Sequence, residues 1–129
     1  MLEGMPDMPR KKILAVDDSQ TILLQERAIL GPAFDVVTAK TGEDGVGAAL
    51  AEPPDLVLMD LEMPGISGFE ATRRLRAQPS TRTTPIILVT SHSEAESLEG
   101  AFTHGCTDYV IKPINEDELL LKVRSYLGE

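Results

Sequence analysis

The chain has 129 residues and a mass of 14.0 kDa, which suits one domain with a sizeable core and is too short for two ordinary domains. Its 21 acidic and 12 basic residues give a net charge of −9, which argues against a broad surface for nucleic acid or an anionic membrane. The sequence has one cysteine and no apolar run of secretory or membrane-spanning length. We therefore expect a cytoplasmic protein without a direct nucleic-acid or membrane partner.

Residues 1–10 are polar, contain two prolines and show no hydrophobic period. We expect them to be a disordered tail, an expression remnant or the result of a start codon assigned too early, and the folded domain to span residues 11–129. Five apolar runs predict strands at residues 13–16, 34–39, 56–59, 86–89 and 109–111. Amphipathic stretches predict helices at 19–30, 42–51, 68–78, 94–104 and 116–127, with Ser19 and Asn115 as N-caps.

Strands that alternate with helices predict right-handed crossovers and a mostly parallel sheet that is covered on both faces. The run "LVLM" at residues 56–59 has no polar alternation, which is typical of a central parallel strand. Ligands of such sheets bind beyond the carboxyl ends of the strands, where the strand order reverses. The polar residues at those ends therefore carry most of the functional information.

Four of the five predicted strands end in groups suited to charge or phosphate chemistry. These residues are Asp17 and Asp18, Asp60, Thr90 and Lys112. The second strand is followed by Lys40 and Thr41, an ordinary loop composition, so we expect it at the sheet edge. This asymmetry favours the order 2-1-3-4-5, a doubly wound, flavodoxin-like α/β domain with five parallel strands and five flanking helices.

Three carboxylates in one crevice favour a hard cation, and Mg²⁺ takes carboxylates, waters and phosphate oxygens. Asp60 precedes the turn-rich segment "LEMPGISG", so it is the candidate nucleophile for attack on phosphorus. Lys112 could contact phosphoryl oxygens and Thr90 could donate a hydrogen bond to them. Each residue alone has a plainer interpretation: an aspartate can cap the first helix, Lys112 can be a solvated loop residue and Thr90 a strand-end residue.

Four motifs in this order resemble the receiver domains of two-component response regulators. They are "AVDDS", "LMDLEMPGISG", "PIILVTS" and "GCTDYVIKPI", and the resemblance covers residues 11–128. It implies a domain that takes a phosphoryl group from the phosphohistidine of a histidine kinase, or of a histidine phosphotransfer protein, in a Mg²⁺-dependent reaction. Such a domain catalyses its own phosphorylation and dephosphorylation and is not expected to turn over an external substrate.

The resemblance also implies a role for each site residue. Asp60 is the phospho-acceptor, and Asp17 and Asp18 bind Mg²⁺ with it. We expect direct contact from Asp18 and contact through water from Asp17. The other implied roles are a backbone-carbonyl metal ligand at Glu62, phosphate contacts from Thr90, Ser91 and Lys112, a switch pair of Thr90 and Tyr109, and a cis peptide at Pro113. Without the family, Tyr109 reads as a packed ring with its hydroxyl at the surface.

Two positions are individual to this chain. By resemblance, Glu62 and His92 flank the path of the hydrolytic water, and we expect them to tune the lifetime of the phosphorylated state; the alternative is that both are exposed loop residues. A basic cluster is also present, and we interpret it as a solvated helix face rather than a nucleic-acid site. Its members are Arg73, Arg74, Arg76 and Arg82.

The expected output surface is the face built by the fourth helix, fifth strand and fifth helix. Its target is a downstream protein or an output domain that this chain lacks. Two other functions stay open: an aspartyl phosphatase or phosphotransferase with a vague resemblance to haloacid dehalogenases, and an interaction module that works without phosphorylation. Uptake of a phosphoryl group from a small donor distinguishes the three.

Overall fold

The computed structural model describes residues 9–91 and 95–129. The described strands are β1 (Lys12–Val16), β2 (Asp35–Ala39), β3 (Leu56–Asp60), β4 (Ile86–Thr90) and β5 (Asp108–Ile111). The described helices are α1 (Gln20–Leu30), α2 (Gly42–Ala51), α3 (Gly68–Arg76), α4 (Ala95–Thr103) and α5 (Glu116–Tyr126). No described helix has the length and apolar character needed to cross a bilayer.

The five strands form one parallel sheet in the order β2-β1-β3-β4-β5. This order confirms the fold class predicted from the sequence. The chain moves outward from β1 to the β2 edge and then returns across β1 to β3, β4 and β5. The reversal lies at β1 and β3, so the carboxyl ends of these two strands border the crevice where ligands of this architecture bind.

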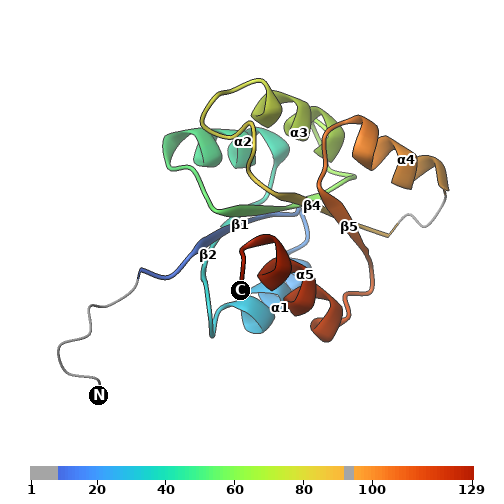
Figure 1. Ribbon diagram of the computed structural model, residues 1–129. Helices are drawn as coiled ribbons and strands as arrows, with labels where there is room; N and C mark the ends of the chain where they lie inside the picture. Colours follow the sequence, from blue (N-terminus) through green and yellow to red (C-terminus); the bar gives the residue numbers. More distant parts are fainter. Residues whose placement is uncertain (1–8, 92–94) are drawn as a thin grey trace, which may run out of the picture.

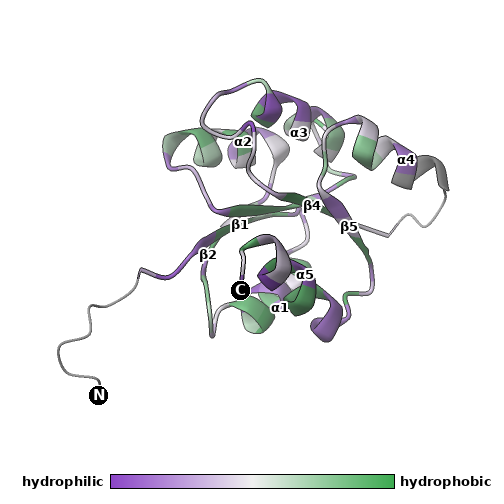
Figure 2. Ribbon diagram, in the orientation of Figure 1, coloured by the Kyte–Doolittle hydropathy of each residue, from purple (hydrophilic) through white to green (hydrophobic). Residues whose placement is uncertain are grey.

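Helices cover both faces of the sheet. Helices α1 and α5 lie on one face, and α2, α3 and α4 lie on the other (Figure 1). The middle of the sheet is mostly hydrophobic (Figure 2), and alternate residues of the strands enter two separate apolar clusters. In β3, for example, Leu58 packs toward α1 and α5 whereas Met59 packs toward α2 and α3. Burial on both sides explains the run "LVLM".

Local signals set the helix starts. The side chains of Ser19 and Asn115 accept hydrogen bonds from the backbone N–H groups of Ile22 and Glu118, at 3.3 and 2.9 Å. Both residues are therefore the N-caps that the sequence predicts. Thr41 and Ser67 cap α2 and α3 in the same way.

Some predicted boundaries shift by one or two residues. Strands β3 and β4 extend by one residue, to Asp60 and Thr90, so these polar side chains stand on the sheet itself. Helix α3 ends at Arg76, before the predicted residue 78, and α5 ends at Tyr126. The predicted start of the fourth helix at residue 94 and the predicted tail over residues 1–8 lie outside the described residues.

Candidate functional site

The register of the sheet brings the polar strand ends together. Val16 pairs with Met59 across β1 and β3, so the next residues, Asp17 and Asp60, are neighbours. On the other side of β3, Asp60 pairs with Val89, the residue before Thr90. Neighbouring parallel strands thus deliver these groups to one edge, because each strand presents its carboxyl end there.

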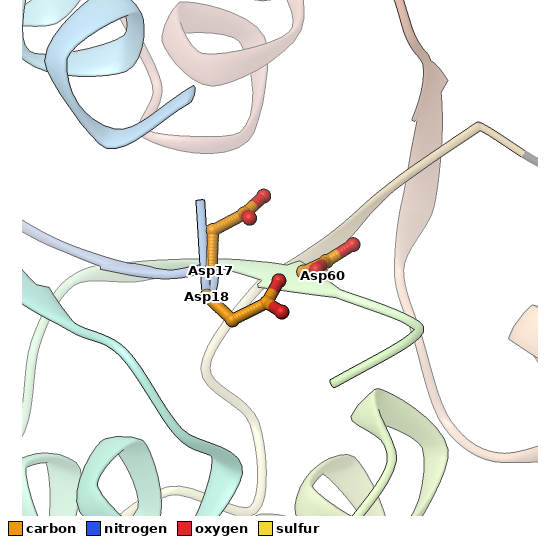
Figure 3. A group of neighbouring side chains, drawn as sticks. All are labelled: Asp17, Asp18 and Asp60. Carbon is orange, nitrogen blue, oxygen red and sulfur yellow. The ribbon is translucent and has the colours of Figure 1, made fainter. Parts of the chain in front are cut away.

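Three carboxylates meet at this edge. Asp17, Asp18 and Asp60 each offer an oxygen, and these oxygens all lie within 4.8 Å of one another. Figure 3 shows Asp17 and Asp18 leaving the end of β1 and Asp60 leaving the end of β3 beside them. Asp17 and Asp60 are buried, at 1% and 5% exposure, whereas Asp18 is exposed. The group is therefore open to solvent on the Asp18 side.

Lys112 places a positive charge against two of these carboxylates. Its Nζ lies 3.0 Å from Oδ2 of Asp17 and 3.2 Å from Oδ1 of Asp60. The backbone N–H of Lys112 donates to the carbonyl of Thr90 at 2.7 Å, which fixes the start of the side chain beside β4. The peptide bond between Lys112 and Pro113 is cis. The structure thus holds the lysine inside the site rather than in a solvated loop.

Crowding of like charges shows in the acid–base properties of the site. Burial, followed by the charge of Asp17, raises the pKa of Asp60 to about 7, although Lys112 acts in the opposite direction. Burial lowers the pKa of Lys112, but its contacts with Asp17 and Asp60 outweigh that effect and raise the pKa. Asp60 thus gives up its proton less readily than an ordinary aspartate, and the ammonium of Lys112 stays protonated.

The three aspartates fit a hard divalent cation. Carboxylate oxygens are the preferred protein ligands of Mg²⁺, and the three carboxylates lie within 4.8 Å of one another with the ammonium of Lys112 against two of them. The alternative capping role is also present, because Oδ1 of Asp17 accepts a hydrogen bond from the backbone N–H of Ser19 at 2.9 Å. That bond uses one oxygen of Asp17, so capping and cation binding are compatible.

Two glycines shape the loop between β3 and α3. Gly65 has φ +83, a conformation that favours glycine, within the turn-rich segment that follows Asp60. A Cβ on Gly68 would lie 2.1 Å from the carbonyl oxygen of Asp60, so only glycine lets α3 begin this close to β3. The side chain of Glu62, in this loop, is exposed.

The candidate switch residues lie on the β4 and β5 side of the site. Thr90 is buried at 1% exposure and Ser91 is exposed. Tyr109 is half-buried; its ring packs edge-on against Phe102, and Nζ of Lys122 lies 4.9 Å from its centroid. The ring is thus held among α4, β5 and α5. His92 lies outside the described residues.

The basic cluster is not one solvated face. Arg73 and Arg74 are exposed and pair with Glu70, as expected for a solvated helix. Arg76 is half-buried and donates to the carbonyls of Gly105, Thr81 and Thr84, at 2.7 to 3.0 Å. The prediction was wrong for Arg76, because its guanidinium donates hydrogen bonds to carbonyls of the loops before β4 and β5 and is not solvated.

One charged residue near the site escaped the sequence analysis. Glu26 of α1 is buried at 1% exposure, and burial together with the charge of Asp17 raises its pKa to about 8. The spacing of Leu23, Glu26 and Leu30 along one helix stripe is the signal that could have found it, since a carboxyl at that spacing faces the core.

Comparisons with known proteins agree on one family. Residues 13–124 match the family model of the response regulator receiver domain. The chain is 39% identical over 118 residues to protein PilH of Pseudomonas aeruginosa, covering 91% of this chain and 98% of PilH. It is 35% identical to the response regulator ArlR of Staphylococcus aureus over 90% of this chain, and this match spans about half, 52%, of ArlR.

Solved structures of receiver domains are also similar to this chain. The receiver domain of the sensor histidine kinase PA1611 from Pseudomonas aeruginosa superposes with a TM-score of 0.87 at 30% identity, covering 93% of this chain and 99% of that one. That structure holds a magnesium ion coordinated in its active-site cleft.

Proposed function

This chain belongs to the receiver domain family of response regulators, and we propose that it is a switch whose acceptor is Asp60. The phosphoryl donor is the phosphohistidine of a histidine kinase or of a histidine phosphotransfer protein. The observation that carries the proposal is the convergence of three carboxylates within 4.8 Å, with Lys112 against Asp17 and Asp60. A nucleophile, a cation site and a phosphate-binding ammonium thereby meet at one edge.

Each group has a defined part in the transfer. An oxygen of Asp60 attacks phosphorus, the new O–P bond gives an acyl phosphate, and the histidine nitrogen leaves with the electrons of the broken P–N bond. Asp17, Asp18 and the backbone carbonyl of Glu62 are the proposed Mg²⁺ ligands beside Asp60. Bound there, Mg²⁺ supplies charge neutralisation that keeps Asp60 ionised and screens the incoming phosphoryl oxygens.

The remaining site residues contact the phosphoryl group and respond to it. Lys112 pairs with phosphoryl oxygens, and Thr90, with Ser91 beside it, donates hydrogen bonds to them. Movement of Thr90 toward the phosphoryl group frees space for the Tyr109 ring. Tyr109 already contacts side chains of α4 and α5, so its rotation changes the face formed by α4, β5 and α5, which is the proposed signalling surface.

The receiver domain is proposed to span residues 11–129, and residues 1–10 to be a tail. The domain catalyses its own phosphorylation and dephosphorylation, and it signals to a downstream protein or to an output domain. The lone cysteine and the kinase partner favour the cytoplasm as its compartment.

Phosphorylation by a small donor tests the proposal. The protein is incubated with acetyl phosphate and Mg²⁺, and its intact mass is measured. Wild type should gain one phosphoryl group, and it should gain none with EDTA or in the variant Asp60→Asn. Asp55→Asn, at an exposed carboxyl away from the site, should behave as wild type. Absence of uptake by wild type would support a phosphorylation-independent interaction module, and steady hydrolysis of small phosphate esters would support a phosphatase.

A further inference from the structure

A carboxylic acid occupies the core-facing stripe of α1. Glu26 stands between Leu23 and Leu30 on the buried side of the helix, and its side chain is 1% exposed. The layer around it is apolar and is formed by α1, α5 and one face of the sheet. A leucine at this position would bury more apolar surface at no polar cost.

The carboxyl of Glu26 is not fully paired. Its Oε1 is buried and has no hydrogen-bond partner among the residues that the structure describes. Such an atom lowers stability, because it has lost its water without gaining a donor. After burial, the charges of Asp17, Lys112 and Asp60 also influence the pKa of this carboxyl. Glu26 thus lies within electrostatic reach of the phosphorylation site while making no recorded bond to it.

Lys112 is the donor that could form a hydrogen bond with this unpaired oxygen of Glu26. In this structure its ammonium lies against Asp17 and Asp60, two of the three carboxylates that form the cation site. A divalent cation at those oxygens repels the ammonium and competes for the same partners. The side chain of Lys112 is only 18% exposed, so an ammonium displaced from the aspartates needs another acceptor inside the protein.

We propose that Glu26 is a positioning residue that accepts a hydrogen bond from the Lys112 ammonium when Mg²⁺ occupies the aspartates. The inference rests on the proposed function, since it assumes that this site binds Mg²⁺. The oxygen of Glu26 is a reserve acceptor: it lowers stability in the metal-free protein and lowers the cost of moving Lys112 when the cation binds. The acceptor can be the oxygen of either a carboxylate or a neutral carboxyl group.

Two variants separate the acceptor oxygen from the volume of the side chain. Glu26→Leu keeps a similar volume without an acceptor, whereas Glu26→Gln keeps an acceptor oxygen. Titration calorimetry with Mg²⁺ should show about tenfold weaker binding for Glu26→Leu, the loss expected for one hydrogen bond from a charged group. Glu26→Gln should stay within about twofold of wild type. Equal affinities in the leucine variant and wild type overturn the proposal.

The stability of the metal-free protein should change in the direction opposite to the Mg²⁺ affinity. Urea unfolding in EDTA should give a higher midpoint for Glu26→Leu than for wild type, because an unpaired buried oxygen has been removed. A residue that only supports the fold would lose stability and Mg²⁺ affinity together. A lower midpoint for both Glu26→Leu and the similarly sized Glu26→Met therefore contradicts the reserve-acceptor role, and Glu26→Met replaces the leucine variant if that variant does not fold.

A double-mutant cycle with Lys112→Met tests whether Glu26 affects Mg²⁺ binding through Lys112. Without the ammonium, Glu26→Leu should leave the Mg²⁺ affinity unchanged, since no displaced charge needs an acceptor. Equal weakening in both backgrounds would mean that Glu26 acts directly on the cation, and it would overturn the proposal. Absence of Mg²⁺ binding by wild type would instead refute the proposed function, so the two failures are distinguishable.

Discussion

The charge on Asp60 is the property from which most of the site's behaviour follows. Burial and the neighbouring charge of Asp17 raise its pKa from 3.8 to about 7 in the metal-free protein. An acid with a raised pKa binds more protons in the folded than in the unfolded state between those two values. The free energy of unfolding therefore falls as the pH rises through that range.

Asp60→Asn should remove this loss of stability at high pH, because asparagine carries no charge. In EDTA the variant should be more stable than wild type at pH 8, by roughly 2 to 4 kcal/mol, since one pKa unit corresponds to about 1.4 kcal/mol. The difference should shrink toward pH 5, where the wild-type carboxyl is protonated. Urea unfolding at both pH values measures it. Asp117→Asn, at an exposed carboxyl of α5, should change the free energy of unfolding by less than about 0.5 kcal/mol at either pH. If the difference in this free energy between Asp60→Asn and wild type is the same at pH 5 and at pH 8, the raised pKa of Asp60 is contradicted.

Glu62 should affect how long the phosphorylated state lasts. Its exposed side chain lies in the loop that follows Asp60, where it can orient or hinder a water that attacks the acyl phosphate. Glu62→Ala should change the rate of dephosphorylation without changing the free energy of unfolding by more than about 0.5 kcal/mol. Decay of the phosphoprotein after removal of the donor measures the rate, and identical decay in variant and wild type would leave Glu62 as an ordinary loop residue.

At the residue scale, strand-end chemistry was predictable and side-chain partners were not. The carboxylates could be found because parallel strands bring their carboxyl ends to one edge. Arg76 and Glu26 depend on tertiary neighbours that lie elsewhere in the sequence: loop carbonyls in the first case, and the charged groups at the strand ends in the second. A helical period identifies the face on which a side chain lies, but not the groups that it meets there.

At the scale of elements, the start of α3 packs closely against the backbone at the end of β3. Gly68→Ala should destabilise the protein by about 1 to 3 kcal/mol, because the added Cβ meets the carbonyl oxygen of Asp60 at 2.1 Å and forces the backbone apart. It should also slow phosphorylation by acetyl phosphate, since the Asp60 carboxylate moves with its backbone.

A second glycine offers the matched control. Gly47 lies within α2, is exposed, and has open space where a Cβ would be. Gly47→Ala should stabilise the protein by about 0.5 to 1 kcal/mol through helix propensity and leave phosphorylation unchanged. Urea unfolding and intact-mass time courses of both variants make the comparison. Similar effects of the two substitutions would show that the contact at Gly68 has no special role.

The elements themselves were largely predictable, and the shifted boundaries have a physical reason. Apolar runs locate strands because they mark residues that are buried on both faces. The same criterion ends a strand too early when its last residue is polar yet buried, as in β3 with Asp60 and β4 with Thr90. The caps of α2 and α3 could not be identified for a different reason: Thr41 and Ser67 lie among other turn-forming residues.

At the scale of the whole molecule, the site should couple Mg²⁺ binding to folding. The aspartates are brought together only by the folded sheet, so Mg²⁺ binds the native state and not the unfolded chain. At a hundredfold excess over its dissociation constant, Mg²⁺ should raise the free energy of unfolding by about 2.7 kcal/mol. Asp18→Asn should lose most of this gain and Asp117→Asn should keep it. An increase equal in all three proteins would indicate a nonspecific ion effect.

The strand order was predictable from the same residues that define the site. Only the second strand lacks a chemically distinctive end, and it is the strand that lies at the sheet edge beside β1. The sequence pattern could not predict what binds to the surface formed by α4, β5 and α5. The exposed Phe102 and the Tyr109 ring packed against it mark an apolar area, but the identity of a partner depends on a second surface.

The most direct test of the central claim is the chemical location of the phosphoryl group. Wild-type protein is incubated with acetyl phosphate and Mg²⁺, the acyl phosphate is reduced with borohydride, and the modified residue is identified by fragment mass spectrometry. The account predicts reduction at Asp60 alone, and none when EDTA replaces Mg²⁺. Modification at Asp17 or Asp18, or Asp60 labelling that persists without a divalent cation, would contradict it.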